Sequence, residues 1–153
     1  MIPFLDPAAD EPLAAELKDA GLLAPDILGR IEAALGRPET ATLNEMLLAG
    51  AEWIPEKAWL SWLIRAHGCH RHGPVAWTEE MAEWARRGVP PEGNLPYRLG
   101  SDNLALVALM RPDLKAGTER RFAGPTIAWS AATLAEMREL HRAWSAAAGQ
   151  YLT

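Results

Sequence analysis

Residues that begin and end α-helices recur from one end of the chain to the other, and this pattern constrains the fold more than any other feature. Pro25 and Pro55 suit the first turn of a helix, where the missing N–H of proline costs nothing, and Gly36 and Gly68 suit the residue after the last turn. Thr42 is followed three residues later by a glutamate, which is the pattern of a capping box. The helices predicted in this way cover residues 12–20, 25–35, 43–49, 55–67, 78–87, 103–111 and 130–148.

No stretch of the chain shows a convincing strand pattern, in which apolar and polar residues alternate and β-branched residues are common. The predicted fold class is therefore all-α, a compact bundle of about six to seven short helices. Residues 88–100 contain three prolines and three glycines, which predicts a loop because proline cannot donate to a strand ladder. We expect this loop to join two helical groups, residues 10–87 and 101–149, within one domain of residues 1–153. One alternative stays open, since Leu104–Leu109 is also typical of a buried strand.

The predicted helix with the most apolar surface contains Ala58–Ile64, which is apolar around most of its circumference. Such a helix is normally covered on several sides, so we expect it at the centre of the bundle. The chain has seven tryptophans, and their large apolar area indicates mainly core packing. The alternative is a ligand pocket lined by aromatic side chains. Its candidate ligand-binding residues are Trp59, Trp62, Trp144 and His141.

Composition limits the class of protein. The chain has 153 residues, 49% of them hydrophobic and 23% charged, which fits one folded domain. A single cysteine cannot form an internal disulfide, and residues 1–6 lack the basic start and apolar run of a secretory signal, so we expect a cytoplasmic protein. Apolar runs such as Leu104–Met110 are too short to span a membrane, so no membrane span is predicted.

The net charge of −5 is unevenly distributed along the chain. Residues 1–56 hold 11 acidic and 3 basic side chains, whereas residues 57–153 hold 9 acidic and 12 basic ones. A surface that binds nucleic acid normally needs a clustered basic patch. The nearest approach to one is the set Arg65, Arg71, Arg86 and Arg87. Solvated helix faces explain these arginines better, so no nucleic-acid partner is predicted.

Three of the four histidines and the only cysteine lie within six residues, and these candidate metal ligands are His67, Cys69, His70 and His72. Imidazole and thiolate bind zinc and related metals, usually with about two to four residues between paired ligands. Both His67 with His70 and Cys69 with His72 satisfy this spacing. The two pairs interleave, so a closed zinc site needs ligands from elsewhere. His141 is the candidate, because it shares its helix face with apolar residues.

Two other interpretations of this cluster stay open. In the simpler one, His67 lies at a helix C-terminus, where an imidazolium suits the helix dipole. The other three residues then lie in an exposed turn, and no cofactor is bound. In the second, Cys69 is a nucleophile assisted by a neighbouring histidine. No orienting acid or oxyanion-binding turn can be identified for it in the sequence.

Residues 13–35 carry leucines around the motif Gly21-Leu22-Leu23, and residues 43–63 repeat a similar pattern with the motif Ile54-Pro55-Glu56. On these motifs, residues 12–65 resemble the helical N-terminal domain of type II secretion and type IV pilus assembly ATPases. The resemblance covers about a third of the chain. It implies a helical interaction module.

Some members of that family bind cyclic di-GMP through an arginine before the first leucine and a glutamine after the last helix. Pro12 and Thr42 occupy the arginine positions here, and no glutamine follows Leu35 or Leu63. The resemblance therefore does not imply nucleotide binding.

These observations favour a small cytoplasmic helical binding or adaptor module for a protein or small-molecule partner. The first alternative is a metal-binding protein centred on residues 67–72, with zinc or another transition metal and a possible catalytic role. The second alternative is a subunit of a larger enzyme complex, docked through loop 88–100 and apolar tryptophans. Self-association into an oligomer also stays open. The sequence contains no glycine-rich phosphate loop, Gly-x-Ser-x-Gly elbow or His-Glu-x-x-His helix, which argues modestly against an enzyme.

Overall fold

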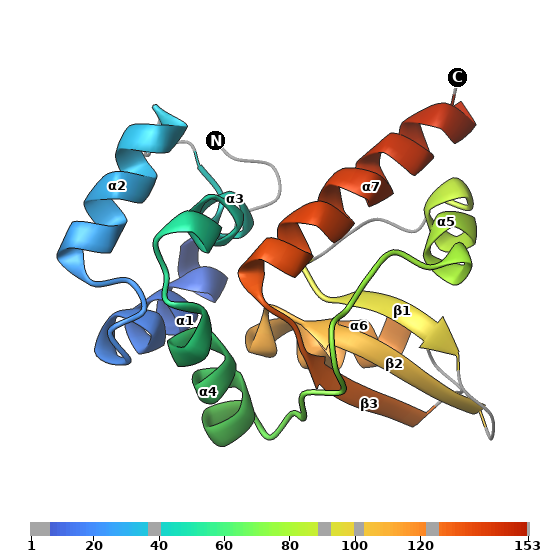
Figure 1. Cartoon of the computed structure of the whole chain (residues 1–153), viewed down its shortest axis with the longest axis horizontal. Coiled ribbons are helices and arrows are strands. Elements are labelled where there is room, and N and C mark those ends of the chain that lie inside the picture. Colours follow the sequence, from blue (N-terminus) through green and yellow to red (C-terminus); the bar gives the residue numbers. More distant parts are fainter. Residues whose placement is uncertain (1–6, 37–40, 89–92, 100–102, 122–125, 153) are drawn as a thin grey trace.

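The computed structural model describes residues 7–36, 41–88, 93–99, 103–121 and 126–152 (Figure 1). Within these residues the chain forms seven α-helices, two 3-10 helices and a three-stranded mixed sheet, so the fold is α/β and the predicted all-α class is wrong. The elements in chain order are α1 (Pro7–Asp19), α2 (Pro25–Leu35), α3 (Leu43–Ala49), η2 (Gly50–Glu52), α4 (Glu56–His67), α5 (Glu79–Arg86), β1 (Leu95–Leu99), β2 (Leu104–Leu109), η4 (Pro112–Leu114), α6 (Lys115–Arg121), β3 (Thr126–Ala131) and α7 (Leu134–Leu152).

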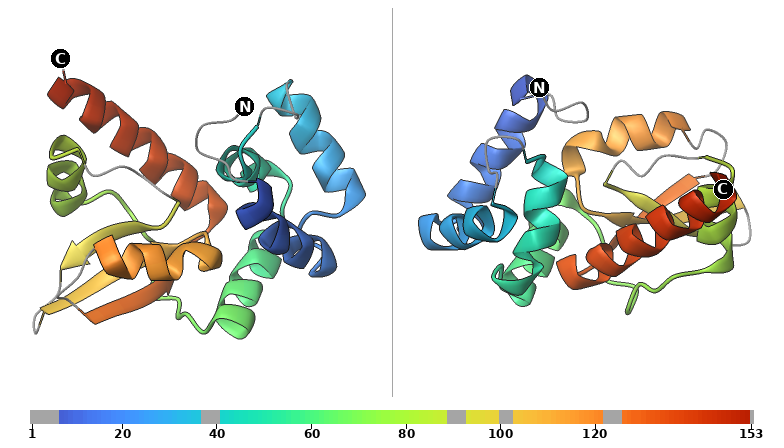
Figure 2. Two further views of the ribbon diagram at one scale, coloured as in Figure 1. Left: turned by 180° about the vertical axis from the view of Figure 1, so that it is seen from behind. Right: turned by 90° about the horizontal axis from the view of Figure 1, so that it is seen from above.

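Helices α1 to α4 gather at one end of the molecule, and the sheet with α5, α6 and α7 forms the other end (Figure 1). Helices α5 and α7 pack together on one face of the sheet, and α6 lies on the opposite face (Figure 2). Helix α7 also contacts α3 and η2, so it connects the two ends. Over the described ranges, no helix combines the length and the apolar character that crossing a membrane requires.

Strand β1 lies within residues 88–100, where we predict a loop. It pairs antiparallel with β2, and the register shifts between Pro96 and Arg98, so the chain bulges at Tyr97. Pro96 is tolerated because β1 is an edge strand, where a missing N–H need not break the ladder. The proline and the bulge interrupt the alternation by which a strand is usually identified, and this explains the error.

Strand β2 replaces the helix predicted over residues 103–111 and confirms the alternative of a buried strand. It is the central strand, paired with β1 on one side and in parallel with β3 along its whole length on the other. A run of apolar residues buried on both faces has the same pattern as a buried helix segment, so periodicity could not separate the two. The predicted helix caps Ser101 and Asp102 lie outside the described residues.

Strand β3 contains Ser130, which we predict as the start of the last helix. Helix α7 begins four residues later, after Thr133. The backbone N–H of Glu136 donates to Thr133 Oγ1 at 3.0 Å, and the N–H of Thr133 donates to Glu136 Oε1 at 2.8 Å. This reciprocal pair is a capping box, so the correct cap carries the expected Thr-x-x-Glu signal, three residues beyond the one we chose.

The helices predicted from terminal residues elsewhere are confirmed as α2, α3, α4 and α5. Gly36 and Gly68 follow α2 and α4 in the left-handed conformation, with φ of 69° and 63°. Thr42 and Thr78 accept first-turn N–H groups at 3.0 and 3.2 Å, as N-caps do. Helix α1 is the exception, because it begins before Pro12 and carries this proline inside it.

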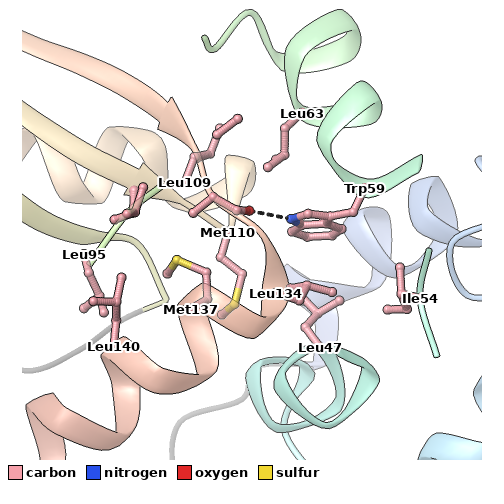
Figure 3. Close-up of a cluster of buried hydrophobic side chains, with 14 of the residues drawn as sticks. Leu47, Ile54, Trp59, Leu63, Leu95, Leu109, Met110, Leu134, Met137 and Leu140 are labelled. Carbon is pink, nitrogen blue, oxygen red and sulfur yellow. Dashed lines mark hydrogen bonds between the residues drawn. The ribbon is translucent and has the colours of Figure 1, made fainter. Parts of the chain in front are cut away.

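The hydrophobic core runs through both ends of the molecule (Figure 3). Trp59 and Leu63 are fully buried and project from α4 toward Leu134 and Met137 of α7 (Figure 3). The indole N–H of Trp59 donates to the carbonyl of Ala132 at 3.0 Å, which satisfies its one polar atom. The segment that follows β3 is therefore fixed to α4.

Helix α4 is not the covered central helix that its composition predicts. Trp59, Trp62 and Leu63 are buried, but Ile64 is 39% exposed and Ala58 is also exposed. The helix lies at the side of the molecule and packs on the core through one face (Figure 1). Side chains of β2 and α7, such as Leu109 and Trp144, are fully buried instead.

Candidate functional site

The segment of residues 67–72 leaves α4 and runs along the outer edge of β3. Gly68 adopts a left-handed conformation and turns the chain out of the helix. His70 then forms a parallel bridge with Ser130. Its N–H donates to the carbonyl of Trp129 at 3.2 Å, and its carbonyl accepts the N–H of Ala131 at 2.8 Å. The segment is therefore tied to the edge of β3 by a single bridge instead of forming the exposed turn of the simpler interpretation.

The candidate metal ligands on this segment do not converge. Cys69 points into the core and is 1% exposed, whereas His70 and His72 are exposed on the outer side. The rings of His70 and His72 lie 6.1 Å apart, and His72 Nδ1 is hydrogen-bonded to Ser130 Oγ at 2.9 Å. Across the described parts of the chain, no group of three or more His, Cys, Asp or Glu side chains is placed to hold a metal ion. The arrangement gives no support to a zinc site.

The surroundings of Cys69 disfavour its thiolate. Burial raises the pKa of the Cys69 thiol, and the charge of Lys115 and a backbone hydrogen bond only partly offset this effect. The thiolate is the nucleophilic form of cysteine. Cys69 therefore lacks the exposed, electropositive surroundings of a catalytic cysteine.

His141 is hydrogen-bonded to a residue outside the 67–72 segment. Its Nε2 is hydrogen-bonded to the carbonyl of Gly93 at 3.1 Å. Burial lowers the pKa of His141, and the hydrogen bond to Gly93 offsets part of this shift. The neutral imidazole thus ties α7 to Gly93, two residues before β1, as a core histidine bonded to a carbonyl does.

The predicted aromatic box is divided into two separate pairs. The rings of Trp59 and Trp62 lie 5.1 Å apart in α4, and Trp144 packs edge-on against Trp77 at 6.3 Å. Trp59 and Trp144 are fully buried, and Trp62 is 8% exposed. These three indoles are core side chains and line no described cavity.

The partly buried polar network around Glu136 was not predicted from the sequence. The guanidinium of Arg71 binds both carboxylate oxygens, at 2.6 and 3.1 Å, and also donates to the carbonyl of Ala131 at 3.0 Å. The N–H of Val75 adds a further bond to Glu136 at 3.0 Å. The network holds residues 71–75 against the start of α7. The sequence signal that could have pointed to Glu136 is its capping-box spacing from Thr133.

A second buried network surrounds Arg111, which is 4% exposed. Its guanidinium donates twice to Asp113, at 3.0 and 2.7 Å, and once to Asn44 of α3 at 2.8 Å. Asn94 accepts the N–H groups of Met110 and Arg111 and donates to the carbonyl of Arg111. The network joins both ends of the molecule. It could not be predicted from the sequence, because an arginine before a proline forms no recognisable motif.

His67 takes part in a small surface hollow. Its Nε2 is hydrogen-bonded to Glu16 Oε2 of α1 at 2.5 Å, and its carbonyl accepts from Lys115 Nζ at 2.8 Å. The hollow beside it has a volume of about 180 Å³. We call it the α1–η4 hollow, and its lining residues are Pro12, Leu13, Glu16, His67, Pro112 and Asp113.

Three elements distant in sequence build the α1–η4 hollow, which makes it a candidate binding feature of the described residues. Its walls are mainly prolines and a leucine, and its polar groups are two carboxylates and one imidazole. No protein-family model, no curated protein and no solved structure matches the chain.

Proposed function

We propose that this protein is a binding module that recognises a segment of a partner protein at the α1–η4 hollow. The observation that carries the proposal is the hollow itself, in which α1, the end of α4 and η4 surround apolar walls. Protein interfaces depend on a few anchor side chains that fill pockets of this kind.

The size of the hollow supports a side chain as its occupant. Pockets that enclose a cofactor or drug-sized ligand usually have about 300–1,000 Å³, whereas this hollow has about 180 Å³. A single side chain fits such a volume. The surrounding surface of α1 and η4 is then available for the flanking residues of the partner.

Several polar side chains outside the hollow hold elements of the fold together. His72 is paired with Ser130, Arg71 with Glu136, and His141 with the Gly93 carbonyl. Each of these contacts fixes one element to another. The resemblance of residues 12–65 to the interaction modules of secretion and pilus ATPases also supports the proposal of a binding module.

The test is a selection of random peptides displayed on phage against the purified protein. Selected peptides are expected to shift the amide NMR signals of Leu13, Glu16, His67 and Asp113. Pro12→Trp is expected to weaken their binding about tenfold or more, because the indole fills the hollow from its exposed rim.

The matched control is Ala33→Trp, which adds the same indole at an exposed position of α2. It should leave peptide affinity unchanged. Peptides that bind Pro12→Trp as well as the natural chain, or whose signals map to another surface, would show that the hollow is not the recognition site.

A further inference from the structure

We infer that the side chain taken by the α1–η4 hollow is basic, an arginine or a lysine of the partner segment. The inference rests on the proposed function and adds the chemistry of the anchor. It is carried by the combination of apolar walls and carboxylates in one small hollow.

The walls suit the stem of a long basic side chain. Pro12 is exposed on α1, and Pro112 is half-buried on η4. Leu13 also lines the hollow and is 4% exposed. Arginine and lysine place their methylene groups along apolar surfaces of this kind while the charged group reaches polar partners.

The carboxylates of the hollow retain acceptor capacity. Glu16 bonds His67 through Oε2, and its side chain is 42% exposed. Each oxygen of Asp113 accepts one hydrogen bond from Arg111. An ionised carboxylate can accept about four hydrogen bonds, so both groups can bind an incoming cation.

Two basic side chains near the hollow, Arg111 and Lys115, do not line it. Among the described residues that line the hollow there is no lysine or arginine. Arg111 is buried behind Asp113, and Lys115 Nζ is held by the His67 carbonyl and lies over the ring of Trp129 at 5.4 Å. Among the lining residues that the structure describes, His67 competes with the partner for Glu16.

The experiment uses N-acetyl-arginine methylamide as the probe and N-acetyl-citrulline methylamide as its uncharged counterpart, each titrated at millimolar concentrations into the full chain. The arginine probe is expected to shift the amide signals of Leu13, Glu16 and Asp113 in a saturable way. The citrulline probe should bind about two- to fivefold more weakly, because it has nearly the same shape without the charge.

Two variants identify the carboxylate. Glu16→Gln should reduce the affinity for the arginine probe by about two- to fivefold, and Glu139→Gln, at an exposed site on α7, should leave it unchanged. The comparison of the two probes needs no variant, so it stays decisive if Glu16→Gln disturbs the fold.

Equal binding of the two probes, or shifts that map outside the hollow, would overturn the inference. Its failure can be told apart from that of the proposed function. Displayed peptides that occupy the hollow without any basic residue would refute the basic anchor and leave the binding module in place.

Discussion

Glu136 accepts four hydrogen bonds from three residues. Two come from the Arg71 guanidinium, one from the N–H of Val75 and one from the N–H of Thr133. Burial alone would raise the pKa of Glu136, but the bonds from Arg71, Thr133 and Val75 outweigh it and lower the pKa. One carboxylate therefore fixes the 71–75 segment to the start of α7.

We predict that Glu136→Ala lowers the free energy of unfolding by about 2–3 kcal/mol, because it leaves the half-buried guanidinium of Arg71 without its partner. Urea denaturation at neutral pH measures the change. The control is Glu139→Ala, at an exposed position three residues further along α7, and it should have little effect on the free energy of unfolding. A loss as small as that of the control would show that the network contributes nothing to stability.

The imidazole of His141 predicts a pH dependence. Because its pKa is lowered in the folded state, the unfolded chain binds a proton first as the pH falls. The stabilisation is complete above the ordinary histidine range and is lost as the pH falls toward the folded-state pKa. Urea denaturation between neutral and mildly acidic pH should show this loss.

His141→Gln should flatten that part of the stability profile, because glutamine can still donate to the Gly93 carbonyl but does not titrate. His70→Gln, at an exposed site, is the matched control. An unchanged acid-side slope in His141→Gln would assign the pH dependence to other groups.

At the level of elements, the cap of α7 provides a direct test. Thr133→Ala should destabilise the protein by about 1 kcal/mol, since it removes the oxygen that accepts the Glu136 N–H. Guanidinium denaturation followed by far-UV circular dichroism measures it. Ser145→Ala, an exposed serine within α7, should have almost no effect, and equal values for the two variants would refute the role of the cap.

The sequence predicts the elements whose signals are local. Thr42, Thr78, Gly36 and Gly68 mark helix ends because their conformation depends on a few neighbouring residues, and α2 to α5 follow from them. Helix α6 (Lys115–Arg121) was missed because its residues form no apolar stripe.

The strands depend on partners far away in the sequence. Thr126–Ala131 contains two alanines, a serine and a tryptophan, and it becomes a strand because β2 lies alongside it. The position of the 67–72 segment at the edge of β3 depends on Ser130, 60 positions further along the chain from His70. The spacing of these residues suggested metal ligation. Spacing does not show that Cys69 and His70 point in opposite directions, because these directions follow from the extended chain paired with β3.

At the scale of the whole molecule, Arg111 and the continuous core make the two ends one folding unit. The buried cluster includes Leu17 and Leu47 from the helical end together with Leu95 and Met137 from the other end. We therefore expect one cooperative unfolding transition, with tryptophan fluorescence and circular dichroism giving the same midpoint. Two separated transitions would contradict this.

Arg111→Met should lower the free energy of unfolding by about 3 kcal/mol and shift both signals together, because Asp113 and Asn44 lose a buried partner. The control is Arg87→Met, whose ion pair with Glu83 is exposed. If only one of the two signals shifts in Arg111→Met, the guanidinium stabilises one end alone.

The position of Cys69 has a practical consequence for following these transitions. Its sulfur is enclosed and it is the only thiol in the chain, so alkylating reagents can reach it only when the sheet edge opens. The rate of labelling under native conditions would then report how often that opening occurs, without an introduced probe. The native thiol of Cys69 is therefore a built-in reporter of local unfolding.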